Sequence, residues 1–226
     1  VWGEEAEYVL MGWKMAAAAQ PQIDTLKVVA DLLSNGKAGL FDLHLNQLAK
    51  VMNSGAFVEA MTDYSTFVLE AYPKEGQSLD EVKQLLLGEI SRMKRGEFSN
   101  DLVASVVANL KLQFQKALHE NRNRTELMKN AFIHHQSWEE AIHSIDRMQR
   151  LNKSDIVAFA NKYLNNNYVC IYKRQGNDTT IHEMDKPSIT PIPTNNDRQS
   201  DFLKAVVAAE STPIKPRFID FNTDLT

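Results

Sequence analysis

Strand-like and helix-like segments follow one another along residues 6–176 in an order that restricts what this part of the chain can fold into. The runs at residues 8–15 and 168–174, "YVLMGWKM" and "YVCIYKR", combine aromatic and aliphatic side chains, as half-buried strands do. Two more such runs, at residues 56–65 and 66–74, follow closely on one another, which predicts an antiparallel pair. Because helical patterns fill most of the remainder, we expect an α+β fold with an antiparallel-type sheet and a block of helices on one face.

Capping residues and apolar side chains at helical spacing mark the helices between these strands. The polar stretch "HENRNR" at residues 119–124 interrupts one long apolar stripe, so we expect a kink, an exposed segment or a helix break there. The expected helices are one capped by Asp24 or Thr25, one over residues 79–93, one restarting at residues 98–101, one from a capping box of Ser137 and Glu140 through Met148, and one opening at Ser154.

The last quarter of the chain differs in composition. Five of the seven prolines follow residue 186, around one short amphipathic segment at residues 201–209. Proline-rich stretches of this kind act as linkers. We therefore expect one folded domain over residues 6–176 and a linker over residues 177–226. The chain opens without an initiator methionine or a signal-peptide pattern, so we also expect it to be a piece of a longer polypeptide.

Charge, hydropathy and cysteine count exclude several classes of function. The formal net charge is −4 and no basic run exceeds "KR", which argues against nucleic acid as a partner. No apolar stretch approaches the roughly 20 residues needed for a membrane span. The single cysteine, Cys170, rules out an intrachain disulfide and a cysteine-based zinc cluster, and its apolar surroundings indicate a buried core thiol rather than a nucleophile.

The stretch "AFIHHQSWEEAIH" at residues 131–143 raises the question of a metal site. His135, Glu139 and His143 are spaced at i, i+4 and i+8, which would place them on one face of a continuous helix. The capping box, however, begins the helix at Ser137 and leaves His135 outside it, and acidic residues in a first turn are expected from the helix dipole alone. We therefore interpret the stretch as the polar start of a helix.

Other candidate residues are better explained by structure than by chemistry. His44 and His119 stand beside apolar residues and are interpreted as structural, and His182 is expected to be solvated. Arg122 and Arg124 could bind an acidic partner or a substrate carboxylate, but an exposed charged turn is the favoured interpretation. No G-x-S-x-G, H-E-x-x-H or H-x-x-E-H motif occurs. We predict no catalytic, cofactor-binding or metal-binding residue in this chain.

Three stretches together resemble the insulinase/pitrilysin-type zinc peptidase domain. Residues 24–45 resemble its first helix and following glycine-containing turn. Residues 79–110 resemble its paired helices, which a "G-x-(F/I)-(S/T)" turn separates. Residues 151–176 are similar to its closing helix and final strand, and the segment "PIKPRFIDF" at residues 213–221 looks like the start of a further repeat.

The resemblance implies a non-catalytic domain. Catalytic copies in this family carry H-x-x-E-H, which binds zinc and activates water, whereas inactive copies keep the fold and form the opposing wall of a peptide-binding chamber. Since the motif is missing here, the resemblance implies an inactive domain over residues 6–176, no cofactor in this chain and zinc in a catalytic domain of the parent protein. It implies a catalytic domain, in cis or in trans, and a peptide substrate as partners, and it favours a bacterial envelope location.

The resemblance leaves two points open. Some family members use an arginine and a nearby tyrosine on one non-catalytic helix to orient the substrate, but here no tyrosine follows Arg122 or Arg124 before Tyr163. The family also includes inactive members that serve as scaffolds in membrane-bound complexes, so a purely structural module is the alternative function. A self-sufficient metallohydrolase using His135, Glu139 and His143 is a third hypothesis.

Overall fold

A computed structural model of the chain describes residues 1–179, 186–192, 194 and 198–209. The chain divides into two compact units, Val1–Ile181 and His182–Thr226. His182 and residues 213–221, for which the sequence makes predictions, lie outside the described residues.

The first unit is built on a five-stranded sheet with the strand order β1-β5-β2-β4-β3. β2, β3, β4 and β5 pair antiparallel, while the two-residue β1 pairs parallel with β5 and makes the sheet mixed at that edge. The strands are β1 Trp2–Gly3, β2 Tyr8–Met15, β3 Asn53–Glu59, β4 Ser65–Tyr72 and β5 Tyr168–Gln175.

Side chains of the strands alternate between two different environments. In β2 the odd-numbered residues from Val9 to Met15 are buried, and in β4 the odd-numbered residues from Ser65 to Ala71 are buried. Trp13 is the centre of this buried face: its ring lies 5.8 Å from that of Phe67 and 5.1 Å from that of Tyr168, and its indole N–H donates to the Asn165 carbonyl oxygen at 2.9 Å. Buried aromatic rings with a satisfied polar atom are a common way to anchor a sheet core.

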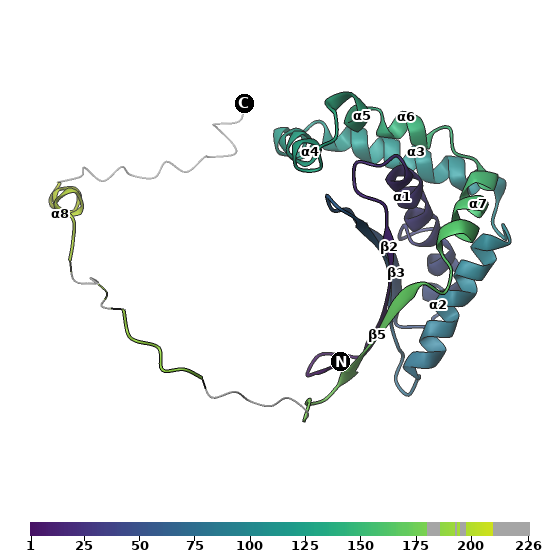
Figure 1. Cartoon of the computed structure of the whole chain (residues 1–226), viewed down its shortest axis with the longest axis horizontal. Helices are drawn as coiled ribbons and strands as arrows, with labels where there is room; N and C mark the ends of the chain where they lie inside the picture. The colour runs from purple at the N-terminus through teal and green to yellow at the C-terminus, as the bar shows by residue number, and fades with distance from the viewer. Residues whose placement is uncertain (180–185, 193, 195–197, 210–226) are drawn as a thin grey trace, which may run out of the picture. The chain divides into compact units, whose positions relative to one another are not determined.

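Helices cover this buried face of the sheet, on the side where the core lies (Figure 1). α1 supplies Leu26, Val29 and Leu33 to the core, and α2 supplies Val82, Leu86 and Met93. The helices of the first unit are α1 Gln22–Leu33, α2 Leu79–Lys94, α3 Asn100–Ala117, α4 Asn121–Ile133, α5 Trp138–Ile142, α6 Ser144–Met148 and α7 Lys153–Tyr163, with a π-helical turn, η1, over Asp42–Asn46.

Two side chains hold the loop between α1 and η1. Oδ1 of Asn35 accepts from the backbone N–H groups of Lys37 and Ala38 at 3.0 and 2.9 Å. Oδ2 of Asp42 accepts hydrogen bonds from the backbone N–H groups of Asn35, Lys37 and Gly39 at 2.9, 3.2 and 3.0 Å. Gly39 is required here because a Cβ would lie 2.4 Å from the carbonyl oxygen of Leu33. The tight turn therefore depends on these two side chains and on Gly39.

The predicted α+β class is confirmed, as are the hairpin of β3 and β4 and the break between α3 and α4. The capping box of Ser137 and Glu140 is also present. The helix that follows ends at Ile142 rather than at Met148, and α6 resumes at Ser144.

Two predicted caps are wrong. α1 begins at Gln22 without a side-chain cap, because the Asp24 carboxylate is paired with Arg147 instead. α7 is capped by Asn152, not by Ser154, because the Asn152 side chain accepts from the backbone N–H groups of Ser154 and Asp155.

In the second unit the described helix is α8, Asp201–Ala208, which Ser200 caps by accepting from the Leu203 backbone N–H. Its apolar side chains Phe202, Leu203, Val206 and Val207 are all exposed. Among the described residues no helix combines the length and hydropathy needed to cross a bilayer.

Candidate functional site

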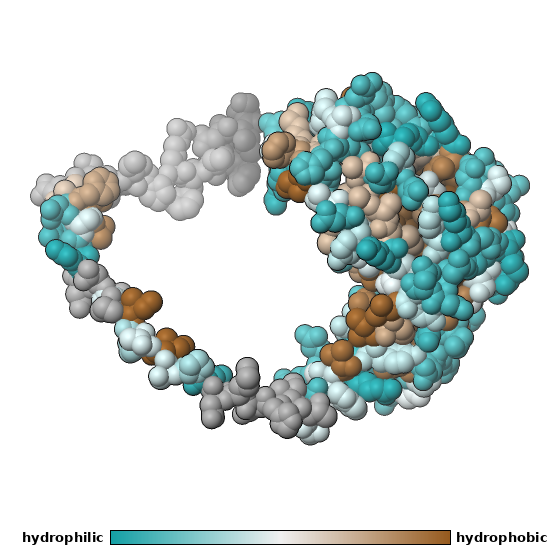
Figure 2. Space-filling view, in the orientation of Figure 1, coloured by the Kyte–Doolittle hydropathy of each residue, from teal (hydrophilic) through white to brown (hydrophobic). Residues whose placement is uncertain are grey.

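The side of the sheet that the helices of the first unit leave uncovered carries an apolar surface. We call this surface the open face; it consists of Leu10, Gly12, Lys14, Phe57, Glu59, Thr66, Val68, Val169 and Ile171. Strand pairing places these residues side by side, because Gly12 of β2 lies opposite Val68 of β4 and Val169 of β5. Brown, apolar surface is visible along this side of the unit in Figure 2.

Exposure distinguishes the open face from an ordinary polar sheet surface. An antiparallel sheet with one solvated face normally places polar side chains there. Here the outward positions include Val169 and Phe57, which are 68% and 38% exposed, around Val68, which is only 4% exposed. Clustered apolar side chains on a surface mark an interaction site more often than scattered ones do.

The open face is shaped as well as apolar. It encloses a hollow of about 350 Å³ above Gly12, walled by Leu10, Val68, Val169 and Ile171. Lys14, Thr66 and Glu59 also line the hollow; the strand register places them in one row across β2, β4 and β3, so polar groups that include both signs of charge flank the apolar residues on one side. An apolar centre with a polar rim is the usual anatomy of a protein interface.

The sheet also has a free edge at β3. β3 is the last strand in the order, and among the described residues it pairs with β4 alone, while the Ser54 carbonyl oxygen accepts a hydrogen bond from the Asn46 side chain. Its first six residues, Asn53 to Val58, contain no proline and no charged side chain, which are the usual means of preventing an edge from pairing with another chain. An extended peptide could add to such an edge through main-chain hydrogen bonds.

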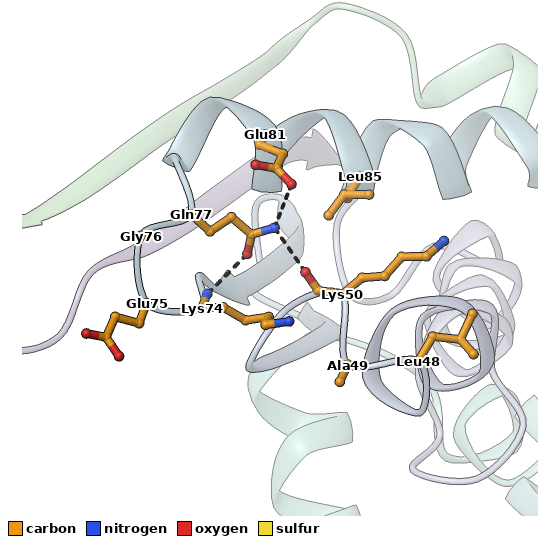
Figure 3. A pocket seen from close by; sticks show the side chains of 9 residues that line it. All are labelled: Leu48, Ala49, Lys50, Lys74, Glu75, Gly76, Gln77, Glu81 and Leu85. Carbon is orange, nitrogen blue, oxygen red and sulfur yellow. Dashed lines mark hydrogen bonds between the residues drawn. The ribbon is translucent and has the colours of Figure 1, made fainter.

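A more polar hollow of about 520 Å³ lies where the loop after η1 meets the turn between β4 and α2 (Figure 3). Its amide side chain, Gln77, accepts from the Lys74 backbone N–H at 3.1 Å and donates to the Lys50 carbonyl oxygen and to Glu81 at 3.0 Å each. Because these bonds join two loops, we interpret the contact as structural and regard the open face as the stronger candidate site.

The structure separates the three residues that raised the metal hypothesis. His135 lies between α4 and α5 with a φ of 54°, and His143 lies between α5 and α6. His143 Nδ1 is 2.7 Å from Asp146 Oδ2, while Glu139 is in the first turn of α5. Within residues 1–179 and the other described segments, no group of three or more His, Cys, Asp or Glu side chains is arranged to hold a metal ion.

His44 has a buried partner that sequence reasoning did not find. Its Nδ1 lies 2.7 Å from Oε2 of Glu89, and Oε1 of Glu89 is 3.4 Å from Nε of Arg92. Glu89 is buried in α2, so the pair attaches η1 to that helix. No signal in the local sequence links His44 to a residue 45 positions away.

Arg122 and Arg124 are both exposed on α4. The Arg124 guanidinium donates to the carbonyl oxygen of Leu118 at the end of α3 and to Oδ1 of Asn121. Arg124 therefore bridges the break between the two helices, which gives it a structural contact in this unit.

Asp24 and Arg147 form a pair that joins α1 to α6, with 2.6 Å between Asp24 Oδ2 and Arg147 Nε. Burial raises the pKa of the Asp24 carboxyl, and the Arg147 guanidinium offsets only part of that shift. Cys170 lies partly buried in β5, and burial raises the pKa of its thiol, which disfavours the thiolate needed for nucleophilic chemistry.

The comparisons with known proteins agree with this fold. Residues 3–110 match the model of the peptidase M16 inactive domain. No curated protein matches the chain.

Three solved structures illustrate the likeness in fold. A protease from Helicobacter pylori is 17% identical with a TM-score of 0.72, over 77% of this chain and 43% of that one. The inactive peptidase domain of a candidate zinc protease from Bordetella parapertussis is 15% identical with a TM-score of 0.66, over 75% of this chain and 93% of that one. A chain of Complex III2 from Candida albicans is 13% identical with a TM-score of 0.63, over 76% of this chain and 45% of that one.

The present chain thus spans less than half the length of the Helicobacter pylori protease, and nearly all of the Bordetella parapertussis domain. The sequence match over residues 3–110 and the likeness in fold together confirm the resemblance of the folded unit to inactive domains of the M16, insulinase/pitrilysin type.

Proposed function

We propose that this chain is the non-catalytic domain of a larger zinc metallopeptidase, in which it packs against the catalytic domain and helps to enclose a peptide substrate. The inactive domain spans residues 6–176, and residues 177–226 are a proline-rich linker to a further domain. Zinc and the water-activating glutamate reside in the catalytic domain of the parent protein, and this chain alone neither binds zinc nor cleaves peptides.

The open face is the observation that carries this proposal. A folded unit that leaves Val169 and Phe57 in water loses the free energy that their burial would supply, at about 25 cal/mol per Å² of apolar surface. A second domain packed on the open face recovers it. The free edge of β3 supports the peptide-binding part of the proposal, because an extended substrate can pair with it.

A matched pair of variants in the parent protein tests the packing. Ile171→Asp places a charge in the open face, and Leu112→Asp places one at an exposed apolar residue of α3 on the helical side. We expect Ile171→Asp to lower kcat/KM for a fluorogenic peptide at least tenfold, because the buried charge disfavours docking. We expect Leu112→Asp to leave it unchanged.

The reading frame that contains this chain tests the catalytic half. An H-x-x-E-H motif elsewhere in that frame, or in a co-purifying subunit, is the expected finding. If this chain alone bound stoichiometric zinc and hydrolysed the peptide, with the zinc lost in His143→Ala, the metallohydrolase hypothesis would replace the proposal.

A structural module of the same fold is the alternative function. The likeness to a chain of Complex III2 favours it, because that chain is part of a multisubunit assembly. A parent protein without any H-x-x-E-H motif or partner peptidase, but with a stable complex in which the open face is buried, would support this alternative.

A further inference from the structure

Gly12 occupies an unusual position for a glycine. It lies in β2, the middle strand of the sheet, and pairs with Val68 on one side and Val169 on the other. Glycine inside a strand weakens it, since it has no side chain to pack and loses more backbone freedom on folding. A glycine in the centre of a sheet therefore requires a reason.

The unit itself does not supply that reason. A Cβ added to Gly12 would meet Cγ2 of Thr66 at 3.4 Å, which is an ordinary van der Waals contact. Gly12 is also absent from the glycines with positive φ, such as Gly36 and Gly76, so an alanine could adopt its backbone conformation. Neither the packing nor the backbone of this unit excludes a larger residue.

The missing side chain instead shapes the open face. Gly12 forms the floor of the hollow of about 350 Å³, and Leu10, Val68, Val169 and Ile171 form its walls. A glycine in a strand interior often marks a place where another molecule approaches the backbone closely. Apolar residues flank Gly12 on both neighbouring strands, and the charged residues Lys14 and Glu59 lie in the adjacent row of the sheet with Thr66.

We infer that Gly12 is the seat for a large apolar side chain that projects from the neighbouring peptidase-like domain of the parent protein. This inference rests on the proposed function and specifies one contact through which the two domains pack. A protein occupant is favoured because Lys14 and Glu59, which carry opposite charges, line the hollow beside its apolar residues, and because the matched region makes up only 43% of the Helicobacter pylori protease. Side chains inserted into central, desolvated pockets dominate the energetics of such interfaces.

Accessibility of a cysteine introduced into the open face measures docking directly. Val169→Cys is made in a Cys170→Ala background, in this chain and in the parent protein, and its reaction with a maleimide is followed by mass spectrometry of the labelled peptide. Since Val169 is 68% exposed here, we expect rapid labelling in this chain and labelling at least about tenfold slower in the parent protein, where docking covers the site.

Gly12→Val then tests the seat. The added side chain fills the hollow, so the partner side chain can no longer enter it. We therefore expect the maleimide to label the introduced cysteine of the parent protein at least about tenfold faster, with a smaller increase for Gly12→Ala. Thermal unfolding of this chain, followed by circular dichroism, should be unchanged or raised, since valine favours strands. Ile171→Trp fills the same hollow from β5 without altering β2 and should reproduce the faster labelling if Gly12→Val does not fold.

The outcomes distinguish a failure of the inference about Gly12 from a failure of the proposed packing between the domains. If the introduced cysteine is protected in the parent protein and both Gly12→Val and Ile171→Trp leave that protection intact, the domains pack without a side chain on Gly12, and the inference is wrong. If the introduced cysteine reacts equally fast in this chain and in the parent protein, the open face is not covered, and the proposed packing fails as well.

Discussion

The Asp42 carboxylate should contribute several kcal/mol to the stability of the first unit. It accepts three backbone N–H hydrogen bonds that hold the loop between α1 and η1, and Oδ1 lies 3.4 Å from Nδ2 of Asn46. Hydrogen bonds to charged groups contribute about 1.5–3 kcal/mol each, and a buried N–H left without a partner costs about 1–3 kcal/mol. The Gly39 N–H is buried, whereas that of Asn35 is only partly buried and that of Lys37 also donates to Oδ1 of Asn35.

We therefore expect Asp42→Ala to lower the free energy of unfolding by about 3–5 kcal/mol, as the loss of one charged bond plus one orphaned buried N–H. Asp42→Asn keeps one acceptor oxygen but turns an NH₂ donor toward another donor on Asn46, so its loss should be about 1–2 kcal/mol. Urea unfolding of the full chain, followed by tryptophan fluorescence, measures both, and an unchanged m-value would show that the same surface unfolds.

Asp63→Ala is the matched control, because Asp63 is an exposed aspartate in the turn of the β3–β4 hairpin. We expect its effect to stay within about 0.5 kcal/mol. A loss below about 1 kcal/mol for Asp42→Ala, or one equal to that of the control, would refute the view that this carboxylate holds the loop.

The remaining predictions concern other buried groups. Arg147→Ala should destabilise the fold by about 3–5 kcal/mol, because it leaves the Asp24 carboxylate buried without its partner, and adding Asp24→Asn should restore most of that loss in urea unfolding. Burial raises the pKa of Asp24, so its contribution to stability is fully present below the unfolded pKa and is lost as pH rises through the folded pKa. The stability of Asp24→Asn relative to the wild type should therefore increase as pH rises from below the ordinary aspartate pKa of about 3.9. Gly39→Ala should lower the melting temperature, since its Cβ would collide with the Leu33 carbonyl oxygen at 2.4 Å. Cys170 should react with iodoacetamide at about pH 7.5 many times more slowly in the folded chain than in urea, because burial raises the pKa of its thiol.

Each of these has an outcome that would contradict it. If Arg147→Ala lowers the free energy of unfolding by the same amount in the wild type and in Asp24→Asn, Arg147 does not act by stabilising the Asp24 carboxylate. An unchanged melting temperature for Gly39→Ala, or equal alkylation of Cys170 in the folded and unfolded chain, would remove the physical basis given for that residue.

Local patterns predict most of the elements because their causes are local. Aromatic and aliphatic side chains over residues 8–15 identify β2, and Ser137 with Glu140 identifies the start of α5, since four consecutive residues are enough to form a capping box. The same locality explains the error at Asp24. The sequence around Asp24 does not distinguish an aspartate that caps a helix from one that pairs with Arg147, which lies 123 positions away.

The candidate site depended on information that is not local. Alternation in β2 separates Leu10 and Gly12 from Val9 and Met11, but it does not say which set faces the helices. That choice follows from the register with β4 and β5 and from the side on which α1 and α2 pack. The pairing of His44 with Glu89 arises in the same way, from the packing of η1 on α2.

By itself, therefore, the sequence determined the kind and order of the elements, the lack of an H-x-x-E-H motif and the resemblance to an inactive peptidase domain, because each of these depends on residues near one another in the chain. Only the tertiary structure decided which side of the sheet the helices of the first unit cover and that Gly12 lines a hollow on the other side. The physical reason is that burial is a property of a whole packed layer, and a strand acquires an inner and an outer face only when helices cover one of them.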